Sequence, residues 1–113
     1  MIVLNLFIPD TMTEISVKEL QQRIQSGDKL LLVDVREPYE HEESDIGGIN
    51  IPVTELPFRI DELKTPEPCD IVLYCQSGNR SILAQKLLAM QFKIENTLNL
   101  KGGVKAWIEE SVE

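Results

Sequence analysis

A cysteine and an arginine bound a short polar loop in the second half of the chain. The loop consists of Cys75, Gln76, Ser77, Gly78, Asn79 and Arg80, and Ser81 follows it. Gly and Asn accept positive φ, so this loop can turn several backbone N–H groups inward to bind an anion. Arg80 adds a full positive charge, and a helix that begins near Ser81 adds the positive end of its dipole. A cysteine in such a setting has a lowered pKa and reacts as a thiolate.

The same loop could stabilise other sulfur anions. Its N–H groups would favour a persulfide, Cys–S–S⁻, on Cys75, or would hold the oxyanion of a sulfur donor. The alternative is that Cys75 is a small apolar residue at the end of a buried strand. Because a Gly-containing loop and Arg80 follow the strand, the residues favour a nucleophile at Cys75 and an anion-binding loop over residues 76–80. Ser77 and Ser81 could each support the site by donating a hydrogen bond to the persulfide, or could cap the helix that follows.

Two more charged residues follow a second predicted buried strand. Asp34 and Arg36 come directly after Leu30–Val33. Because the carboxyl ends of parallel strands meet at one edge of a sheet, this pair should lie near Cys75. Arg36 can then line the binding pocket while Asp34 supports the loop, or the two can form a structural ion pair. The sequence leaves both interpretations open.

The elements that must position these residues alternate between strands and helices. We expect strands over residues 14–17, 30–33, 49–52, 71–74 and 97–100. A capping box of Ser16 and Glu19 predicts a first helix from Val17, and a short helix is expected at Tyr39–Ser44. Three further helices are expected from their apolar spacing: one after Thr54 (Leu56, Ile60, Leu63), one after Ser81 (Ile82, Leu83, Leu87, Leu88) and one after Gly103 (Trp107). This alternation predicts an α/β fold with a parallel sheet covered on both faces.

Composition limits the class of protein. The chain has 113 residues, of which 42% are apolar, and its 11 basic and 19 acidic residues give a net charge of −8. This length fits one domain, and the acidic balance disfavours nucleic acid and anionic membranes as partners. The apolar start of the chain lacks a basic lead, so we interpret residues 1–12 as an arm or extra strand rather than a signal peptide, before a domain over residues 13–110. This arm could pair with a second chain, so a monomer and a homodimer both remain open.

The two cysteines are expected to be free thiols. Cys69 and Cys75 flank the predicted strand 71–74, which at ~3.3 Å per residue holds them roughly 20 Å apart. A disulfide spans at most ~7 Å between Cα atoms, so a reducing cytoplasm is the expected compartment. Their spacing with His41 fits no common zinc pattern, so we predict no metal, and His41 lies in an acidic run typical of a solvated surface.

Four segments resemble, in order, the signatures of rhodanese-like domains. They are Leu32–Glu37, Ile49–Pro52, Cys75–Ser81 and Leu100–Gly103 with Ala106–Trp107, and together they cover most of the chain from Ile15 to Trp107. The resemblance implies a three-layer α/β/α fold with a central five-stranded parallel sheet. It also implies that Cys75 carries sulfur as a persulfide, that the main chain of Gln76 to Arg80 forms the cradle, and that no cofactor is needed. One departure is Asp45, where the family usually has a histidine.

The implied activity is that of a sulfurtransferase. Its donor would be thiosulfate or a protein persulfide, and its acceptor cyanide or a thiol, such as that of a thioredoxin-like or sulfur-carrier protein. With neutral Gln76 after the cysteine and a net charge of −8, small dianions such as thiosulfate should bind weakly, which favours a protein persulfide. Phosphatases related to this family have a loop that is one residue longer, so the loop length favours sulfur over phosphate. A non-catalytic docking module of the same fold is the other alternative.

Overall fold

Five parallel strands form the centre of the molecule. The structure, a computed structural model, describes residues 13–111, so the predicted arm over residues 1–12 lies outside the described part. The strands are β1 (Thr13–Ile15), β2 (Leu30–Asp34), β3 (Ile49–Asn50), β4 (Asp70–Tyr74) and β5 (Thr97–Leu100). They pair in the order β1-β5-β4-β2-β3, and every pair is parallel. The predicted α/β fold with a five-stranded parallel sheet is therefore confirmed.

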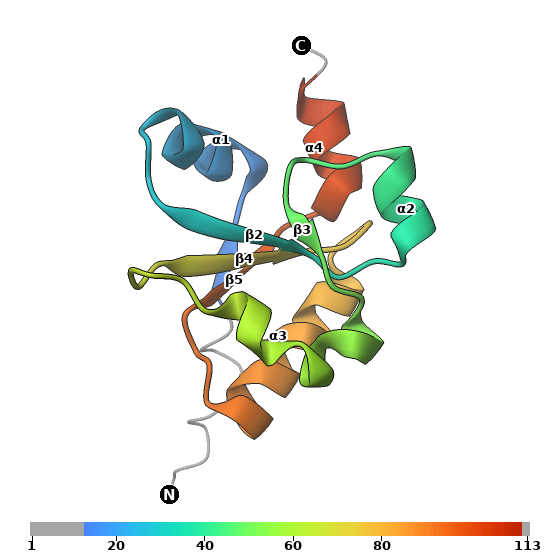
Figure 1. The fold of residues 1–113 in the computed structure, drawn as a ribbon. Coiled ribbons are helices and arrows are strands. Elements are labelled where there is room, and N and C mark those ends of the chain that lie inside the picture. Colours follow the sequence, from blue (N-terminus) through green and yellow to red (C-terminus); the bar gives the residue numbers. More distant parts are fainter. Residues whose placement is uncertain (1–12, 112–113) are drawn as a thin grey trace, which may run out of the picture.

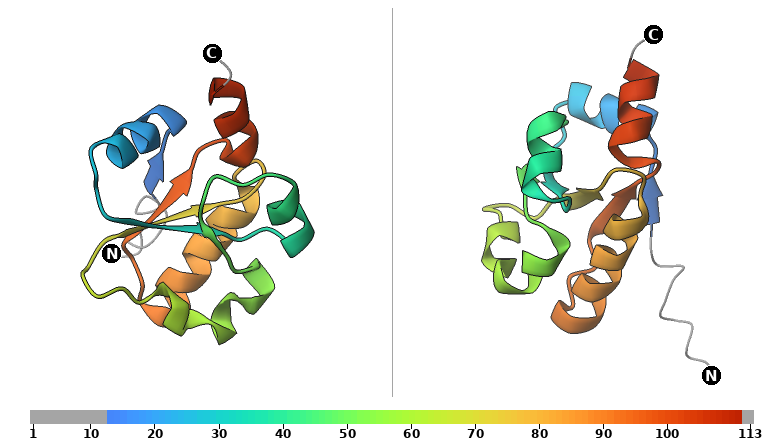
Figure 2. Two further views of the ribbon diagram at one scale, coloured as in Figure 1. Left: turned by 45° about the horizontal axis from the view of Figure 1, so that its top comes forward. Right: turned by 90° about the vertical axis from the view of Figure 1, so that its right-hand side faces the viewer.

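Helices cover both faces of this sheet. They are α1 (Val17–Gln25), α2 (Pro38–Glu43), α3 (Asn79–Phe92) and α4 (Gly103–Ser111). The helices α1 and α4 lie on one face and α3 lies on the other, as Figure 1 and Figure 2 show. The short helix α2 stands beside the carboxyl ends of the strands (Figure 1). This position brings a polar helix to the edge of the sheet where the Cys75 loop begins.

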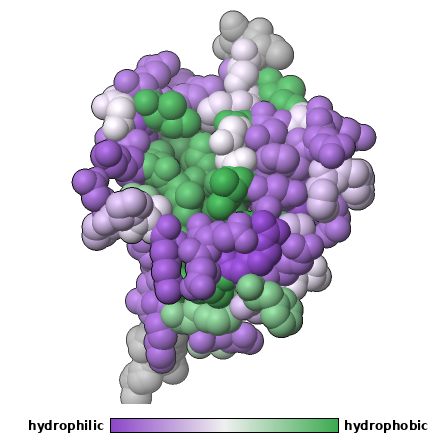
Figure 3. Space-filling model, in the orientation of Figure 1, coloured by the Kyte–Doolittle hydropathy of each residue, from purple (hydrophilic) through white to green (hydrophobic). Residues whose placement is uncertain are grey.

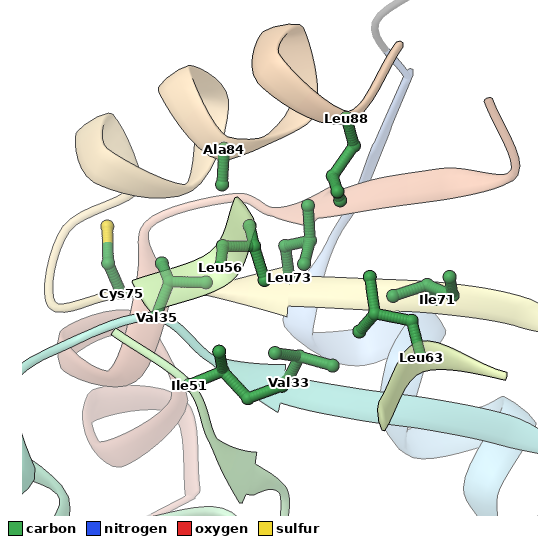
Figure 4. Packing of buried hydrophobic residues seen from close by; sticks show 10 residues of the cluster. All are labelled: Val33, Val35, Ile51, Leu56, Leu63, Ile71, Leu73, Cys75, Ala84 and Leu88. Carbon is green, nitrogen blue, oxygen red and sulfur yellow. The ribbon is translucent and has the colours of Figure 1, made fainter. Parts of the chain in front are cut away.

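Two hydrophobic clusters hold the layers together. The cluster under α3 consists of Val33, Val35, Ile51, Leu56, Leu63, Ile71, Leu73, Cys75, Ala84 and Leu88 (Figure 4). The cluster under α1 and α4 consists of Ile15, Val17, Leu20, Val72, Tyr74, Leu100 and Val104. Each fully buried large aliphatic side chain contributes roughly 1.5–3 kcal/mol. Because Cys75 belongs to the first cluster, the position of its side chain is fixed by the core itself.

The start of α1 follows the prediction. Ser16 Oγ accepts a hydrogen bond from the backbone N–H of Glu19 over 3.0 Å, and Glu19 Oε1 accepts one from the N–H of Ser16 over 2.9 Å. This reciprocal capping box satisfies two of the N–H groups that a helix start leaves unpaired.

The helix expected after Thr54 is not an α-helix. Two 3₁₀ segments, η3 (Val53–Phe58) and η4 (Ile60–Leu63), take its place, and Pro52 rather than Thr54 precedes the first. Pro57 lies inside η3, where a proline lacks the N–H and clashes with the carbonyl four residues earlier. A regular helix is thereby blocked, although Leu56 and Leu63 are buried as their spacing predicts.

The apolar face of α3 differs from the prediction at one position. Ala84 and Leu88 face the core, whereas Leu83 is 57% exposed. The helix begins at Asn79, before the expected start, and its buried face also carries the polar residues Ser81 and Gln85. The first turns of α3 therefore pack on the cysteine loop through small and polar side chains.

The face of the molecule seen in Figure 3 is mostly hydrophilic and carries several hydrophobic areas. Within residues 13–111, no helix is long and apolar enough to cross a membrane. In the space-filling view, a hydrophobic area lies over β2 between α1 and β3, while the surface over α2 is hydrophilic (Figure 3).

Candidate active site

Cys75 lies directly after β4, at the carboxyl edge of the sheet. Cys75 is 1% exposed, and its Sγ points into the space between the loop and the first turn of α3 (Figure 4). The backbone N–H of Gly78 donates a hydrogen bond to Sγ over 3.1 Å. Both this cysteine and Cys69, which precedes β4, are free thiols. The expectation of two unpaired cysteines at opposite ends of one strand is confirmed.

The loop can direct its N–H groups inward because its carbonyl groups are bound on the outer side. The N–H of Val104 donates to the Cys75 carbonyl over 2.9 Å, and the N–H of Lys105 donates to the Gln76 carbonyl over 3.0 Å. This close packing of α4 on the loop requires Gly103, since a Cβ there would lie 2.3 Å from the Cys75 carbonyl oxygen. The first turn of α4 thus orients the loop backbone as an anion cradle.

This environment favours a thiolate at Cys75. Burial by itself raises the pKa of the Cys75 thiol. Hydrogen bonds from the Ser81 hydroxyl and from the N–H groups of Ser81, Gly78 and Ser77 outweigh burial and hold the pKa below its ordinary value. The site therefore holds a recessed sulfur with fixed hydrogen-bond donors that favour its ionised form.

Of the two loop serines, Ser81 is the one whose hydroxyl reaches the sulfur. Its Oγ lies 3.5 Å from Cys75 Sγ, 3.1 Å from the Gly78 carbonyl oxygen, and within hydrogen-bond distance of Asn99 on β5. Ser77 contributes its backbone N–H and has an exposed side chain. The start of α3 is capped at Gly78, so neither serine is the N-cap residue.

Asp34 and Arg36 form a buried ion pair under the loop. Arg36 Nη2 lies 2.8 Å from Asp34 Oδ2, and Arg36 Nε lies 3.0 Å from Asp34 Oδ1. The two residues are 0% and 1% exposed. Arg36 Nη1 donates to Gln76 Oε1 over 3.1 Å, so the pair also contacts the residue that follows the cysteine. Of the two interpretations, the structure shows the ion pair, with a contact to the loop through Gln76.

Arg80 is bound to a carboxylate on α2. Its Nη1 and Nη2 lie 2.7 and 2.9 Å from Oε1 and Oε2 of Glu40, a bidentate pair. The hydrogen bond from Arg80 outweighs desolvation and lowers the pKa of Glu40 to about 2, so this carboxylate is charged at neutral pH. The sequence predicted Arg80 as an anion-binding residue but gave no signal for Glu40, because the acidic run around it has no apolar period.

His41 is not the solvated residue that the sequence predicts. Its side chain is 27% exposed, and Nδ1 lies 2.9 Å from Asp34 Oδ2 and 3.2 Å from Asp45 Oδ1. Asp45 also accepts a hydrogen bond from the Tyr74 hydroxyl over 2.6 Å. The prediction fails because α2 packs beside the end of β2, which turns one face of this acidic helix toward buried Asp34. His41 thus links two carboxylates beneath the site.

Asp34, His41 and Asp45 are of the residue types that bind metal ions. Asp34, His41 and Asp45 offer ligand atoms that lie within 4.8 Å of one another. The Asp34 oxygens are already bound to Arg36, and Asp45 already accepts from Tyr74 and the N–H of Gly47. The donor set is therefore occupied by an ion-pair network rather than arranged around an open coordination site.

The chain resembles other proteins over most of its length. A sequence model of the rhodanese-like domain matches residues 16–110. A sulfurtransferase of Allochromatium vinosum is 39% identical over 95 residues, which cover 83% of this chain and 86% of that protein. The chain spans only 61% and 50% of two longer relatives from Bacillus subtilis. The relatives thus share the domain, and in some of them it is one part of a longer protein.

Solved structures agree with the sequence relatives. A rhodanese-related protein from Thermoplasma volcanium has a TM-score of 0.74 and 31% identity, covering 87% of this chain and 92% of that chain. A thiosulfate sulfurtransferase from Pseudomonas aeruginosa has a TM-score of 0.76 and 26% identity, covering 90% of this chain and 20% of that chain. The sequence match and the shared fold show that the chain belongs to the rhodanese-like domain family.

Proposed function

We propose that this chain is a sulfurtransferase that carries sulfane sulfur as a persulfide on Cys75. The observation that supports this proposal most directly is the 3.1 Å hydrogen bond from the Gly78 N–H to Sγ, to which the N–H groups of Ser77 and Ser81 add. A cradle of fixed donors stabilises a negative charge that stays on sulfur throughout the transfer. The sulfurtransferase named among the relatives supports the same reaction class.

The transfer would take place in two displacements. In the first, the Cys75 thiolate attacks the outer sulfur of the donor, the bond between the donor's outer sulfur and the atom that carried it breaks, and the leaving group departs with the electron pair. With thiosulfate the products are the Cys75 persulfide anion and sulfite. In the second, an acceptor nucleophile attacks the outer sulfur of the persulfide, and the Cys75 thiolate is restored. Cyanide would give thiocyanate, and a thiolate acceptor would give a new persulfide.

The other site residues take supporting roles in this proposal. In the cradle formed by the loop 76–80, the backbone N–H groups of Ser77 and Gly78 would bind the sulfur anion, and Ser81 would donate from its N–H and its hydroxyl. Arg36 holds the loop through Gln76, and Asp34 holds Arg36. The acceptor would be a thiol such as that of a thioredoxin-like or sulfur-carrier protein. The two cysteines in the described part of the chain are free thiols, which is consistent with a protein that acts in a reducing compartment such as the cytoplasm.

The proposal is tested by following the mass of the intact protein. Wild type and the variants Cys75→Ser and Cys69→Ser are incubated with thiosulfate or with the hydropersulfide of 2-mercaptoethanol, and then with cyanide. We expect wild type and Cys69→Ser to gain one sulfur, roughly 32 Da, and to lose it to cyanide as thiocyanate. Cys75→Ser should gain nothing. If no donor adds sulfur to wild type, the proposal is wrong, and phosphatase assays and partner capture would test the phosphatase and docking-module alternatives.

A further inference from the structure

Both arginines at the Cys75 site are already paired with carboxylates. The guanidinium of Arg80 forms two hydrogen bonds with Glu40, whose side chain is 18% exposed. The guanidinium of Arg36 binds buried Asp34 through Nε and Nη2, and it donates from Nη1 to a neutral amide, that of Gln76. Neither arginine offers an uncompensated positive charge to an incoming anion.

The surrounding charges do not make up for this pairing. Asp45 is a further carboxylate next to Asp34, joined to it through His41. On the outer side of α2, Glu42 and Glu43 are exposed. The backbone of Lys105 binds the loop, but its side chain is exposed, where water and salt screen the ammonium charge. An anion that reaches the site thus relies on the N–H groups of the loop.

In the proposed reaction the donors around Cys75 must stabilise the negative charge of the attacking thiolate as well as any charge on the sulfur donor. The Gly78 N–H and the Ser81 hydroxyl are directed at the Cys75 sulfur, which the loop favours as a thiolate. Thiosulfate brings a charge of −2 against this thiolate, so the encounter brings three negative charges to a site where Arg36 and Arg80 are both paired with carboxylates. A hydropersulfide on an otherwise uncharged thiol brings at most one negative charge, and none in the protonated form R–S–SH that is attacked. Its outer sulfur is attacked by the Cys75 thiolate, the S–S bond breaks, RS⁻ leaves, and the proton of the transferred sulfur passes to water.

We propose that Glu40 is a specificity-determining residue, which by pairing with Arg80 excludes dianionic sulfur donors and selects a persulfide carried on a thiol. The inference rests on the sulfurtransferase function proposed above and adds its substrate class. Glu40 does not touch the sulfur, so it acts through Arg80. Removing its charge should free Arg80 to bind the sulfonate end of thiosulfate and should leave the reaction with a hydropersulfide, which has no sulfonate, nearly unchanged.

The variant Glu40→Gln changes this charge without removing the helix start. Glu40 Oε1 accepts a hydrogen bond from the N–H of Glu37 over 2.9 Å, at the third position of α2. Gln keeps this oxygen and is the other residue that a capping box uses there, so α2 should stay folded. Glu43→Gln is the matched control, because it removes one charge from an exposed position of the same helix.

The experiment measures the rate of sulfur loading on Cys75 against donor concentration, for the full chain and both variants. The donors are thiosulfate and the hydropersulfide of 2-mercaptoethanol. For wild type we expect half-saturation by the hydropersulfide at a concentration at least tenfold lower than by thiosulfate. Glu40→Gln should lower the thiosulfate constant by roughly tenfold, the scale of a freed hydrogen bond to a charged group, and leave the hydropersulfide constant within about twofold. Glu43→Gln should leave both constants near the wild-type values.

Three results would overturn the inference. The first is saturation of wild type by thiosulfate at concentrations as low as those of the hydropersulfide. The second is an equal effect of Glu40→Gln and Glu43→Gln, which would assign the selectivity to net charge. The third is no effect of Glu40→Gln on the thiosulfate constant. Loading of Cys75 by neither donor is a different result, since it would refute the sulfurtransferase function itself.

Discussion

The backbone N–H of Gly78 donates to Sγ of Cys75 over 3.1 Å, and Gly78 holds this position at φ 107° and ψ −7°. An L side chain rarely adopts such a φ, so the conformation that aims the N–H at the sulfur depends on glycine. A Cβ there would meet its neighbours at 3.6 Å or more, which is ordinary contact. The requirement for glycine at this position is therefore one of backbone conformation rather than of space.

Gly78→Ala should lower both stability and the reactivity of the thiol. Forcing alanine into a left-handed conformation costs about 1–2 kcal/mol, and any relaxation turns the N–H away from Cys75. Gly27→Ala is the matched control, because Gly27 has a φ of 81°, has open space around it and lies at the end of α1. We expect both variants to unfold at lower urea concentration and only Gly78→Ala to slow alkylation of Cys75 by iodoacetamide. Equal alkylation rates in the two variants would contradict this role of the Gly78 N–H.

Ser81→Ala should shift the pH profile of Cys75. The Ser81 hydroxyl stabilises the thiolate, so its loss raises the pKa of Cys75 and moves the alkylation profile to higher pH. A lost hydrogen bond of about 1 kcal/mol corresponds to roughly fivefold slower alkylation at pH 7. Ser77→Ala removes a hydroxyl from the same loop but keeps the N–H that faces the sulfur. A profile that moves equally in both variants would show that the Ser81 hydroxyl has no specific effect.

Arg36→Met should destabilise the fold strongly. It leaves the Asp34 carboxylate, which is fully buried, without its main partner, and loss of one member of a buried pair costs about 3–5 kcal/mol. Arg59→Met removes an arginine that pairs with Glu55 and Glu62 at the surface, where such pairs contribute about 0–1 kcal/mol. Urea unfolding curves for the two variants test the difference. A cost below about 1 kcal/mol for Arg36→Met would mean that the buried pair adds little to stability.

The Glu40–Arg80 pair should make stability depend on acid. Because the folded state lowers the pKa of Glu40 from 4.5 to about 2, the pair stabilises the fold fully above pH 4.5, and this contribution is lost as the pH falls toward 2. Wild type should therefore be more stable than Glu40→Gln at pH 7, and the difference should shrink between pH 4.5 and 2. Unfolding by urea at pH 7, 4 and 2.5 measures it, with Glu43→Gln as the control. A difference that stays constant over this range would contradict the ionic character of the pair.

The sequence predicted the fold through short-range patterns. Apolar runs at 30–33 and 71–74 marked the buried strands, and the Ser16–Glu19 pair marked the start of α1. The loop from Cys75 to Arg80 could be recognised because its residues are consecutive and because Gly has a defined backbone preference. The predicted α-helix after Thr54 is absent, because Pro57 prevents a regular helix there. Leu83 is exposed, although the helical spacing of apolar residues predicted that it faces the core.

The amino-acid sequence by itself determined the parallel α/β sheet, the cysteine at its carboxyl edge and the Gly-containing polar loop that follows it. Only the tertiary structure decided which charges meet there. Arg36 reaches Gln76, and Glu40 reaches Arg80, in both cases across 40 residues of chain, and His41 turns toward buried Asp34. Hydrophobic periodicity specifies which side of a helix or strand is buried, because each apolar residue on that side contributes to the free energy of folding when it is removed from water. The partner of a charged residue in an ion pair has no such periodic pattern in the sequence. The pair forms only where packing of the fold brings two distant segments together.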